Sequence, residues 1–401
     1  MNNDFNQSIP RADAEALRAD AGPLGADVEP LRAVVEPLGA DADGPALVVG
    51  LDAGGTRTRA VLATAADGRL LGEGAAGPGN ALTVPLPELT DHLVEAVAQA
   101  VPEAARGRVV AVAGGFAGAT GASADDLGHR NAQTALTVAL RGLGIFAGPP
   151  GICSDIEAAF ASAPGTPADG LALVAGTGAV AMRITDRHCT ATVDGDGWLL
   201  GDDGSGFWIG RAAVRAALRM ADGRGAGTVL AGLVGRELGL PGEALPEGAS
   251  VEGVPGGGVS VERAPAEGAP AEEARLSTAP TSWSRPGREA YRMHLLPVVM
   301  AAPPIRLARL APLVVEAARD KDAVALAILD EAADQLTATV RALEARPGER
   351  VVATGGLLGP DGPLTDLLAA RLRPLGLSLD WVADGCRGAV ALARLEYGRR
   401  S

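Results

Sequence analysis

The chain has 401 residues, more than one average domain and enough for two compact domains with cores of their own. Its 47 % hydrophobic and 21 % charged residues exclude a disordered chain, and its net charge of −14 argues against non-specific nucleic-acid binding. The only lysine, Lys321, does not stand beside Ser or Thr, so a Walker A phosphate loop is excluded.

Cysteine usage and hydropathy indicate the compartment. The three cysteines, Cys153, Cys189 and Cys386, are widely spaced without a CxxC pair, which is typical of reduced thiols in a cytoplasmic protein. The polar, acidic N-terminus does not have the pattern of a signal peptide. The most apolar stretch, residues 295–305, is too short to span a bilayer. We therefore expect a cytoplasmic protein without a membrane partner.

Ordered structure is expected to follow residues 1–45, an acidic segment rich in Ala, Pro and Gly that we expect to be a disordered tail. The apolar run at 46–51 is typical of a buried strand, and Asp67-Gly68 is typical of a turn. Leu and Val at helical spacing then predict a helix around 89–101. The other elements expected in this half are strands at 57–64, 69–74 and 109–113 and a helix at 131–143.

A similar order of elements recurs in the second half of the chain. Two copies of a unit of strand, Gly-rich turn, two strands and helix predict an α/β protein with two duplicated lobes and a cleft between them. Residues 247–289 are rich in Pro, Gly and Ser without periodicity, so we expect a flexible insertion there. The elements expected in this half are strands at 171–175, 180–185, 190–193 and 351–353 and helices at 209–220, 305–318, 323–345 and 389–397.

Two glycine-rich turns carry the chemistry of a phosphate site. Asp52-Ala53-Gly54-Gly55-Thr56 follows the first strand, and adjacent glycines let backbone N–H groups approach a phosphate closely. Thr56 adds a hydroxyl, and Asp52 is placed to hold Mg²⁺ through water. The segment also fits an ordinary hairpin turn. Gly176-Thr177-Gly178 repeats the arrangement in the second copy, and the pair favours a triphosphate site.

With these turns, the chain resembles the superfamily of acetate and sugar kinases, Hsp70 and actin over residues 46–397. Within it, the chain is most similar to the N-acetylglucosamine kinase and BadF/BcrA ATPase group. The resemblance implies two actin-like, ribonuclease H-like lobes: 46–152 joined by a helix at 389–398, and 153–388. It also implies ATP and Mg²⁺ as cofactors. The first phosphate motif would be Asp52, Gly54, Gly55 and Thr56, and the second would be Gly176, Thr177 and Gly178. The adenosine motif would be Gly355 and Gly356.

The segment Ser154-Asp155-Ile156-Glu157 is an ordinary helix start by its residue types. In the kinases that the chain resembles, the Asp of an (Asn/Ser)-Asp pair accepts the proton of the attacking sugar hydroxyl, and Asp155 is the matching position. Phosphoryl transfer needs mainly alignment and charge neutralisation. We therefore expect Asp155 to orient and deprotonate the 6-hydroxyl of a sugar.

Residues 194–208, DGDGWLLGDDGSGFW, resemble the sugar-contact segment of N-acetylglucosamine kinases and also actinobacterial glucosamine kinases. Asp196 stands where the former commonly have an aromatic residue, and a carboxylate favours an ammonium group over an acetamido group. The acidic pair Asp194 and Asp196 therefore favours glucosamine, giving glucosamine 6-phosphate, with N-acetylglucosamine as the alternative. The substrate contacts that the resemblance implies are Asn80, Asp155, Asp196, Gly197, Asp202 and Gly206.

Two other functions compete with this hypothesis. A BadF-type ATPase that activates a dehydratase would need thiolate ligands for an iron–sulfur cluster. Cys153 lies near the expected cleft, but those activators have a cysteine where this chain has Ala175. A nucleotide-regulated binding protein would have no use for the sugar segment. The four histidines show no metal-ligand spacing. Dimers are the commonest oligomers, so we expect a homodimer with small-molecule partners only.

Overall fold

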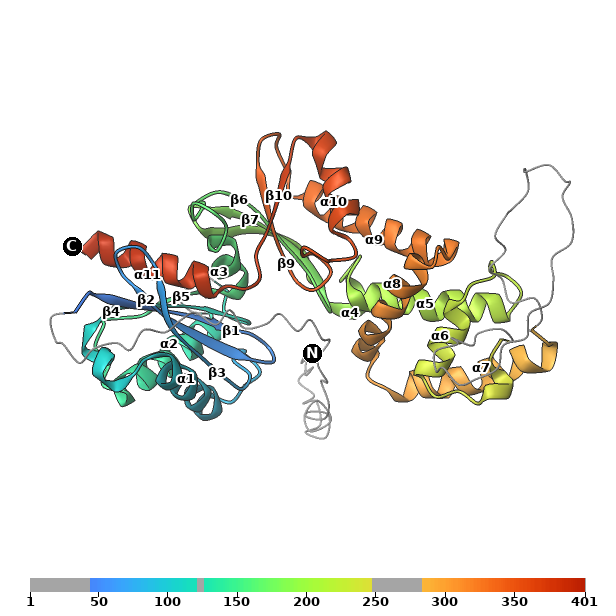
Figure 1. Cartoon of the computed structure of the whole chain (residues 1–401), viewed down its shortest axis with the longest axis horizontal. Coiled ribbons are helices and arrows are strands. Elements are labelled where there is room, and N and C mark those ends of the chain that lie inside the picture. Colours follow the sequence, from blue (N-terminus) through green and yellow to red (C-terminus); the bar gives the residue numbers. More distant parts are fainter. Residues whose placement is uncertain (1–43, 121–125, 247–282, 401) are drawn as a thin grey trace, which may run out of the picture. The chain divides into compact units, whose positions relative to one another are not determined.

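The computed structural model describes residues 44–120, 126–246 and 283–400, which form two five-stranded sheets with their helices (Figure 1). The expected tail, residues 1–45, lies outside the described residues apart from its last two positions. Most of the expected insertion, residues 247–282, also lies outside them. The α/β class is confirmed, because each half of the described chain contains a mixed sheet with helices packed on it.

The first sheet has the strand order β3-β2-β1-β4-β5. β1 pairs antiparallel with β2 and parallel with β4, so the sheet is mixed. Helices α1 and α2 cover one face, and the C-terminal helix α11 covers the other (Figure 1). The elements are β1 (Leu47–Ala53), β2 (Thr58–Thr64), β3 (Leu70–Ala76), β4 (Val109–Phe116), β5 (Gly151–Ser154), α1 (Leu86–Ala100), α2 (Leu127–Gly142), η3 (Glu103–Arg108) and α11 (Cys386–Arg400).

Alternation along β1 explains the two layers. Leu47, Val49 and Leu51 are buried against the side of α1 and α2, whereas Val48 is buried against α11. Gly50 lies on the α11 side, and a Cβ there would lie 2.5 Å from the backbone nitrogen of Val390. Only glycine therefore lets the helix pack this closely on the strand.

The second sheet has the order β10-β9-β6-β7-β8, with β6 antiparallel to β7 and parallel to β9. Leu171 and Leu173 of β6 belong to the large core with α5, α8, α9 and α10. Ala172 faces the opposite way, towards Phe160 of α3. The elements are β6 (Gly170–Ala175), β7 (Ala179–Thr185), β8 (His188–Asp194), β9 (Arg350–Thr354), β10 (Ser378–Trp381), α3 (Asp155–Ala161), α4 (Gly197–Leu200), α5 (Gly206–Ala221), α6 (Leu230–Glu237), η4 (Gly242–Ala244), α7 (Arg285–Ala301), η5 (Pro304–Leu310), α8 (Ala311–Arg319), α9 (Ala323–Ala342), α10 (Thr365–Leu372) and η6 (Arg373–Leu375).

Three details differ from the sequence expectations. The end of the expected insertion was placed too late in the sequence, at residue 289. Helix α7 already begins at Arg285, with Ser284 as its N-cap. The helix expected at 305–318 is a 3₁₀ helix followed by α8, whose second residue is Pro312. Proline has no N–H to donate and its ring crowds the preceding turn, so Pro312 favours a break between the 3₁₀ helix and α8. Strands β5 and β10 and helices α4, α6 and α10 were not expected, since each is short and gives little periodic signal. The 17-residue helix α7 was not expected either, and it contains Pro297, which argues against a helix in the sequence.

No single helix within residues 44–120, 126–246 and 283–400 combines the length and apolar character of a membrane span. One pair, Arg285–Ala301 with Pro304–Arg319, meets both criteria only when its two helices are taken together, and they are bent by 120°.

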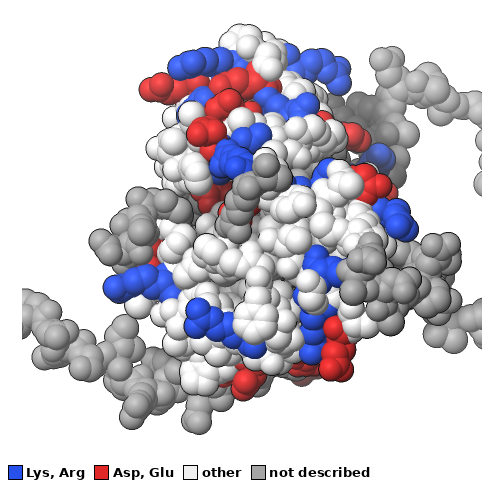
Figure 2. Space-filling model, turned by 90° about the vertical axis from the view of Figure 1, so that its left-hand side faces the viewer, with Lys and Arg blue, Asp and Glu red and all other residues white. Residues whose placement is uncertain are grey.

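Charged side chains are interspersed on the face drawn in Figure 2. Lys and Arg side chains lie among Asp and Glu side chains there, separated by uncharged residues. On this face the described residues form no broad basic area of the kind that a nucleic-acid backbone needs.

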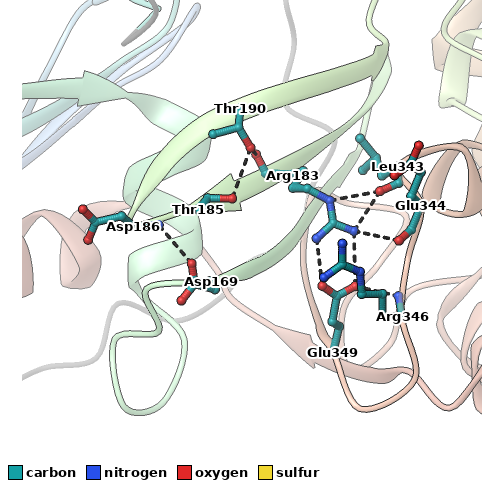
Figure 3. Close-up of polar contacts among 9 residues, drawn as sticks. All are labelled: Asp169, Arg183, Thr185, Asp186, Thr190, Leu343, Glu344, Arg346 and Glu349. Atoms are coloured by element: carbon teal, nitrogen blue, oxygen red, sulfur yellow. Dashed lines mark hydrogen bonds and ion pairs between the residues drawn. The ribbon is translucent and has the colours of Figure 1, made fainter.

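Arg183 of β7 connects the second sheet to the end of α9 (Figure 3). Its guanidinium donates to both carboxylate oxygens of Glu349, at 2.8 and 3.3 Å, and to the carbonyl oxygens of Leu343 and Glu344. The hydrogen bond from Arg183 is the main reason why the pKa of Glu349 lies below its usual value near 4.5. A planar fork fits this set of acceptors, which an ammonium group would not match.

We expect Glu349→Gln to lower the free energy of unfolding by about 1 kcal/mol at pH 7, since it removes a hydrogen-bonded, partly buried ion pair. The folded-state pKa of Glu349 is lowered, so its contribution is present above the unfolded pKa and is lost as the pH falls through the folded pKa. The difference between wild type and variant should therefore shrink below about pH 4.5. Urea unfolding at several pH values measures it. Glu289→Gln, which removes an exposed pair with Arg285, is the control and should cost less than about 0.5 kcal/mol.

Candidate active site

The first glycine turn connects β1 to β2, beside Asp52. The Gly54 N–H donates to the Arg57 carbonyl at 2.9 Å, and the Gly54 carbonyl accepts from the Gly79 N–H at 2.8 Å. Gly55 and Thr56 are exposed, and a Cβ on Gly55 would meet no atom within 4 Å. The outer side of this turn is therefore open, as a phosphate-binding turn requires.

The second glycine turn connects β6 to β7 and is held by the start of α5. The N–H groups of Gly206 and Phe207 donate to the carbonyl oxygens of Gly176 and Thr177. A Cβ on Gly178 would lie 2.6 Å from a carboxylate oxygen of Asp202. The requirement for glycine at position 178 thus comes from Asp202, whereas Gly176 has open space beside it.

The expected adenosine motif lies next to the second turn. Gly355 follows β9, with φ of +105°, and a Cβ there would overlap the carbonyl oxygen of Ala175, the last residue of β6. The Leu357 N–H donates to the same oxygen at 3.1 Å. Gly356 has no neighbour within 4 Å of a Cβ position. The ends of two parallel strands therefore bring the second phosphate motif and the adenosine motif together.

Asp155 is the first residue of α3, and the start of this helix is fixed on both sides. The Ser154 hydroxyl accepts from the Glu157 N–H at 3.1 Å, and Glu157 Oε2 accepts from the Ser154 N–H at 2.8 Å, which completes a capping box. The other oxygen of Glu157 accepts from the Cys189 N–H of β8 at 2.8 Å. The carboxyl group of Asp155 therefore extends from a rigid position.

The pKa of Asp155 is raised to about 6, first by burial and then by the negative charge of Asp52. Burial also raises the pKa of Asp52, while the Arg59 guanidinium and the Gly385 N–H act in the opposite direction. Two carboxyl groups thus influence each other, and within the part of the chain that the structure describes only Asp52 has a cation, Arg59, that lowers its pKa. A carboxyl group with a pKa near 6 is suited to accept a proton close to neutral pH.

Asn80 lies in the turn after β3, and its side-chain oxygen is already engaged in hydrogen bonds with the backbone. Its side-chain oxygen accepts from the N–H groups of Leu82 and Thr83, at 2.9 and 3.0 Å. An amide oxygen has two lone pairs, so both are used. The –NH₂ group is what Asn80 retains for a ligand.

The acidic pair of the sugar segment is not a pair of equivalent groups. The Asp194 carboxylate accepts from the backbone N–H groups of Gly195, Asp202 and Asp203, at 2.7, 2.6 and 2.9 Å. It therefore holds its own loop together, as an Asp in a tight loop often does. Asp196 is exposed at the start of α4 and caps nothing with its side chain.

Asp202 lies between the sugar segment and the second glycine turn. It is buried and accepts from the Ala179 N–H at 3.0 Å. Its φ of +57° places it in the left-handed region, and burial is the main cause that raises its pKa. Gly197 begins α4 with φ of +81°, and Gly206 begins α5. Asp202 thus supports the phosphate turn in addition to any ligand that it contacts.

Four residues at this site were missed from the sequence: Arg59, Glu157, Asp384 and Gly385. Arg59 lies directly opposite Asp52 in the β1–β2 register, which the hairpin pattern alone would have indicated. Glu157 was expected only as a helix-start residue. Asp384 and Gly385 lie more than 300 positions from Asp52, and no local signal links them to it.

Two pockets, of about 430 and 790 Å³, lie in the described part of the chain outside these turns. The first is lined mainly by the loop at 164–170 and by 348–350, and the second by residues of α8, α9 and α10. Neither contains a residue expected to bind nucleotide or sugar. The candidate site rests on the placement of its polar groups.

One curated protein is similar to part of this chain. The N-acetylmuramic acid/N-acetylglucosamine kinase of Clostridium acetobutylicum is 28 % identical over 187 residues, which is 46 % of this chain and 58 % of that relative. The match therefore spans only somewhat more than half of the curated relative's length.

Two solved structures of candidate N-acetylglucosamine kinases have the same fold. The protein from Chromobacterium violaceum has a TM-score of 0.54 at 21 % identity, over 87 % of this chain and 99 % of its own. The protein from Porphyromonas gingivalis has a TM-score of 0.56 at 18 % identity, over 88 % and 99 %. These neighbours confirm the expected actin-like α/β fold. Residues 49–370 match the BadF/BadG/BcrA/BcrD ATPase family, and the chain belongs to that family.

Proposed function

We propose that the protein is an ATP-dependent sugar kinase of the N-acetylglucosamine kinase type, acting on the 6-hydroxyl of an amino sugar. The observation that carries this proposal is Asp155, a buried carboxyl group with a pKa of about 6, fixed at the start of α3 and near Asp52. The similarity to the clostridial kinase supports the same reaction class. The division into lobes at 46–152 with 389–398, and 153–388, belongs to this proposal, as do a cytoplasmic location and a homodimer.

The residues present fit a magnesium nucleotide. Both glycine turns have open outer sides, and Asp52 supplies the hard carboxylate oxygen that Mg²⁺ prefers. Backbone N–H groups of Gly55 and Thr56 and of Thr177 and Gly178 would hold the phosphates, because the Gly54 and Gly176 N–H groups donate within their own turns. Gly355 and Gly356 would lie near the adenosine. When bound, Mg²⁺ neutralises charge that develops on the transferring phosphoryl group.

Asp155 performs the chemistry that the chain itself supplies. Its carboxylate accepts the proton of the sugar hydroxyl as the oxygen attacks the γ-phosphorus, and the bond to the leaving ADP breaks. Burial raises the pKa of Asp155, so the proton has a suitable acceptor. The capping box and the bond from Glu157 to β8 keep this carboxylate in place during the reaction.

The acceptor that we favour is N-acetylglucosamine, with glucosamine second. The expected preference for glucosamine rested on two carboxylates, and Asp194 uses its oxygens within its own loop. Asp196 remains, and an exposed carboxylate contributes little to binding an ammonium group. The activity named for the clostridial relative also includes N-acetylglucosamine.

We expect ADP release with Mg-ATP to depend on sugar, and kcat/KM to be highest for N-acetylglucosamine in a panel with N-acetylmuramic acid, glucosamine and glucose. Asp196→Asn should change the ratio of kcat/KM values for N-acetylglucosamine and glucosamine by less than about fivefold, because an exposed ion pair is worth at most about 1 kcal/mol. A preference for glucosamine that is lost in Asp196→Asn would instead establish the acidic wall as the selective element.

A dehydratase activator is the less supported alternative. Burial raises the pKa of both Cys153 and Cys386 well above the usual thiol value, which opposes the thiolate form that a cluster needs. The Cys153 thiol donates to the Gly114 carbonyl. An iron-containing protein that hydrolyses ATP without any sugar would overturn the kinase proposal.

A further inference from the structure

A three-residue electrostatic arrangement lies beside the first glycine turn and involves the segment before α11. Arg59 of β2 lies opposite Asp52 of β1. Its Nη1 donates to Asp384 Oδ2 at 2.9 Å, whereas its Nη2 is 3.8 Å from Asp52 Oδ2. The guanidinium is therefore hydrogen-bonded to Asp384 and only near Asp52.

The arrangement leaves one oxygen of Asp52 available. Asp52 Oδ2 accepts from the Gly385 N–H at 3.3 Å and faces Arg59. Asp52 Oδ1 accepts no hydrogen bond from the described residues. The side chain of Asp52 is 15 % exposed and that of Asp384 is 21 % exposed. Because water reaches only a small part of each carboxylate, the nearby Arg59 guanidinium contributes to balancing both negative charges.

The position of Asp384 is fixed independently of Arg59. Its Oδ1 accepts from the Cys386 N–H at 2.9 Å, and its carbonyl oxygen accepts at 2.9 Å from the hydroxyl of Ser162, the residue that follows α3. The Ser162 hydroxyl also accepts from the Gly388 N–H. A Cβ on Gly385 would lie 3.3 Å from Asp52 Oδ1, so the backbone passes close to this carboxylate.

An arginine opposite Asp52 is at first sight unfavourable for a cation site. If Arg59 were paired directly with Asp52, it would neutralise the carboxylate that is to hold Mg²⁺ and compete with the ion. A second carboxylate that binds the guanidinium more closely prevents this competition. Arg59 in turn offsets the repulsion between Asp52 and Asp384, whose ligand atoms lie within 4.8 Å of each other.

We propose that Asp384 is a positioning residue for nucleotide-bound Mg²⁺: it holds the Arg59 guanidinium away from Asp52 and leaves the Asp52 carboxylate free for the ion. This inference rests on the proposed function in that it takes Asp52 as the magnesium residue. It does not depend on which sugar is the acceptor. In this role Asp384 acts through Arg59 and is not a ligand of the ion.

The test measures Mg²⁺ binding without turnover. Purified full-length protein is saturated with ADP, and the half-saturating Mg²⁺ concentration is obtained by calorimetry and by the ADP-dependent rise in Tm. Asp384→Asn keeps an acceptor for the Cys386 N–H but loses the charge. We expect Arg59 to move onto Asp52 and the half-saturating Mg²⁺ concentration to rise about tenfold.

The double variant Arg59→Gln with Asp384→Asn separates this mechanism from a merely structural role. It removes the competing cation, so the half-saturating Mg²⁺ concentration should return to within about threefold of wild type. A structural role predicts that the double variant is at least as impaired as Asp384→Asn. The control is Asp380→Asn, which removes the Asp380–Arg350 pair of 2.9 Å and should leave Mg²⁺ binding unchanged.

An unchanged Mg²⁺ dependence in Asp384→Asn, or a double variant that is not restored, would overturn the inference. Sugar turnover is measured separately on the same proteins. Wild-type protein that binds Mg-ADP but phosphorylates no sugar would overturn the proposed function alone. Protein that phosphorylates a sugar while Asp384→Asn binds Mg²⁺ normally would overturn the positioning role alone.

Discussion

Asp155→Asn is expected to lower kcat by about 10²–10⁴-fold, the usual contribution of a positioned general base. The amide cannot take up the proton of the sugar hydroxyl. Its oxygen can still accept the hydrogen bond that the Ile156 N–H donates to Asp155 Oδ1 at 3.0 Å in the wild type. The start of α3 should therefore be preserved, and Tm should stay close to that of wild type. Sugar-dependent ADP release at saturating Mg-ATP is the measurement.

Asp169→Asn is the matched control. Asp169 is also an aspartate, and its carboxylate accepts a hydrogen bond from the Asp186 N–H in the β7–β8 turn, away from the candidate site (Figure 3). It should retain wild-type turnover. If Asp155→Asn also retained full turnover, the assignment of the base would be wrong.

The pH dependence of kcat/KM is an independent test of Asp155 as the base. Burial and the charge of Asp52 raise the pKa of Asp155 to about 6, so its basic form is present above that pH. In wild type, kcat/KM should fall about tenfold per unit as the pH drops below about 6. The residual activity of Asp155→Asn should not show this step. A profile that is flat from pH 5 to 8 in wild type would contradict the role of Asp155.

Asp322→Ala is expected to have the largest effect on stability, about 3 kcal/mol or more of the free energy of unfolding. Asp322 is 2 % exposed and accepts from the Thr228 hydroxyl and from the N–H groups of Val229, Val324 and Ala325, at 2.9–3.0 Å. It caps α9 and at the same time fixes the segment before α6. Truncation would leave several buried donors without an acceptor.

Denaturant unfolding of Asp322→Ala measures this loss. Asp126→Ala is the control, because Asp126 caps α2 through the His129 N–H, and its further acceptance from the Thr120 N–H reaches a residue six positions earlier rather than a distant element. An N-cap of this kind is worth about 1 kcal/mol. Equal losses in the two variants would show that the link between α9 and the segment before α6 contributes nothing.

Local signals in the sequence predicted many of the elements and the candidate phosphate turns. The continuous apolar run at 46–51 predicted β1, because a buried strand needs apolar side chains on both of its faces. Ser154 and Glu157 predicted the start of α3, because the capping box is formed within four residues. Gly54-Gly55 and Gly176 to Gly178 were recognised as turns, because their backbone freedom is a property of the residue itself.

Local sequence signals did not predict the short or interrupted elements. Strand β10 has four residues, Ser378–Trp381, and pairs only with β9, so its stability depends on a neighbour far along the chain. The division of the expected helix at 305–318 depended on where Pro312 lies in the turn. In both cases the local preference is weak and packing determines the structure.

The sequence by itself indicated the fold class through the repeated order of elements and the two glycine turns through their residue types. It indicated Asp155 as the candidate base through the resemblance of its segment to a kinase motif. Only the tertiary structure decided which groups were already engaged. Asp194 turned out to be satisfied by its own loop, and Arg59 to be bound by Asp384. A sequence states which donors and acceptors a segment carries. Their partners are set by how distant segments pack, and this determines the charge that remains for a ligand.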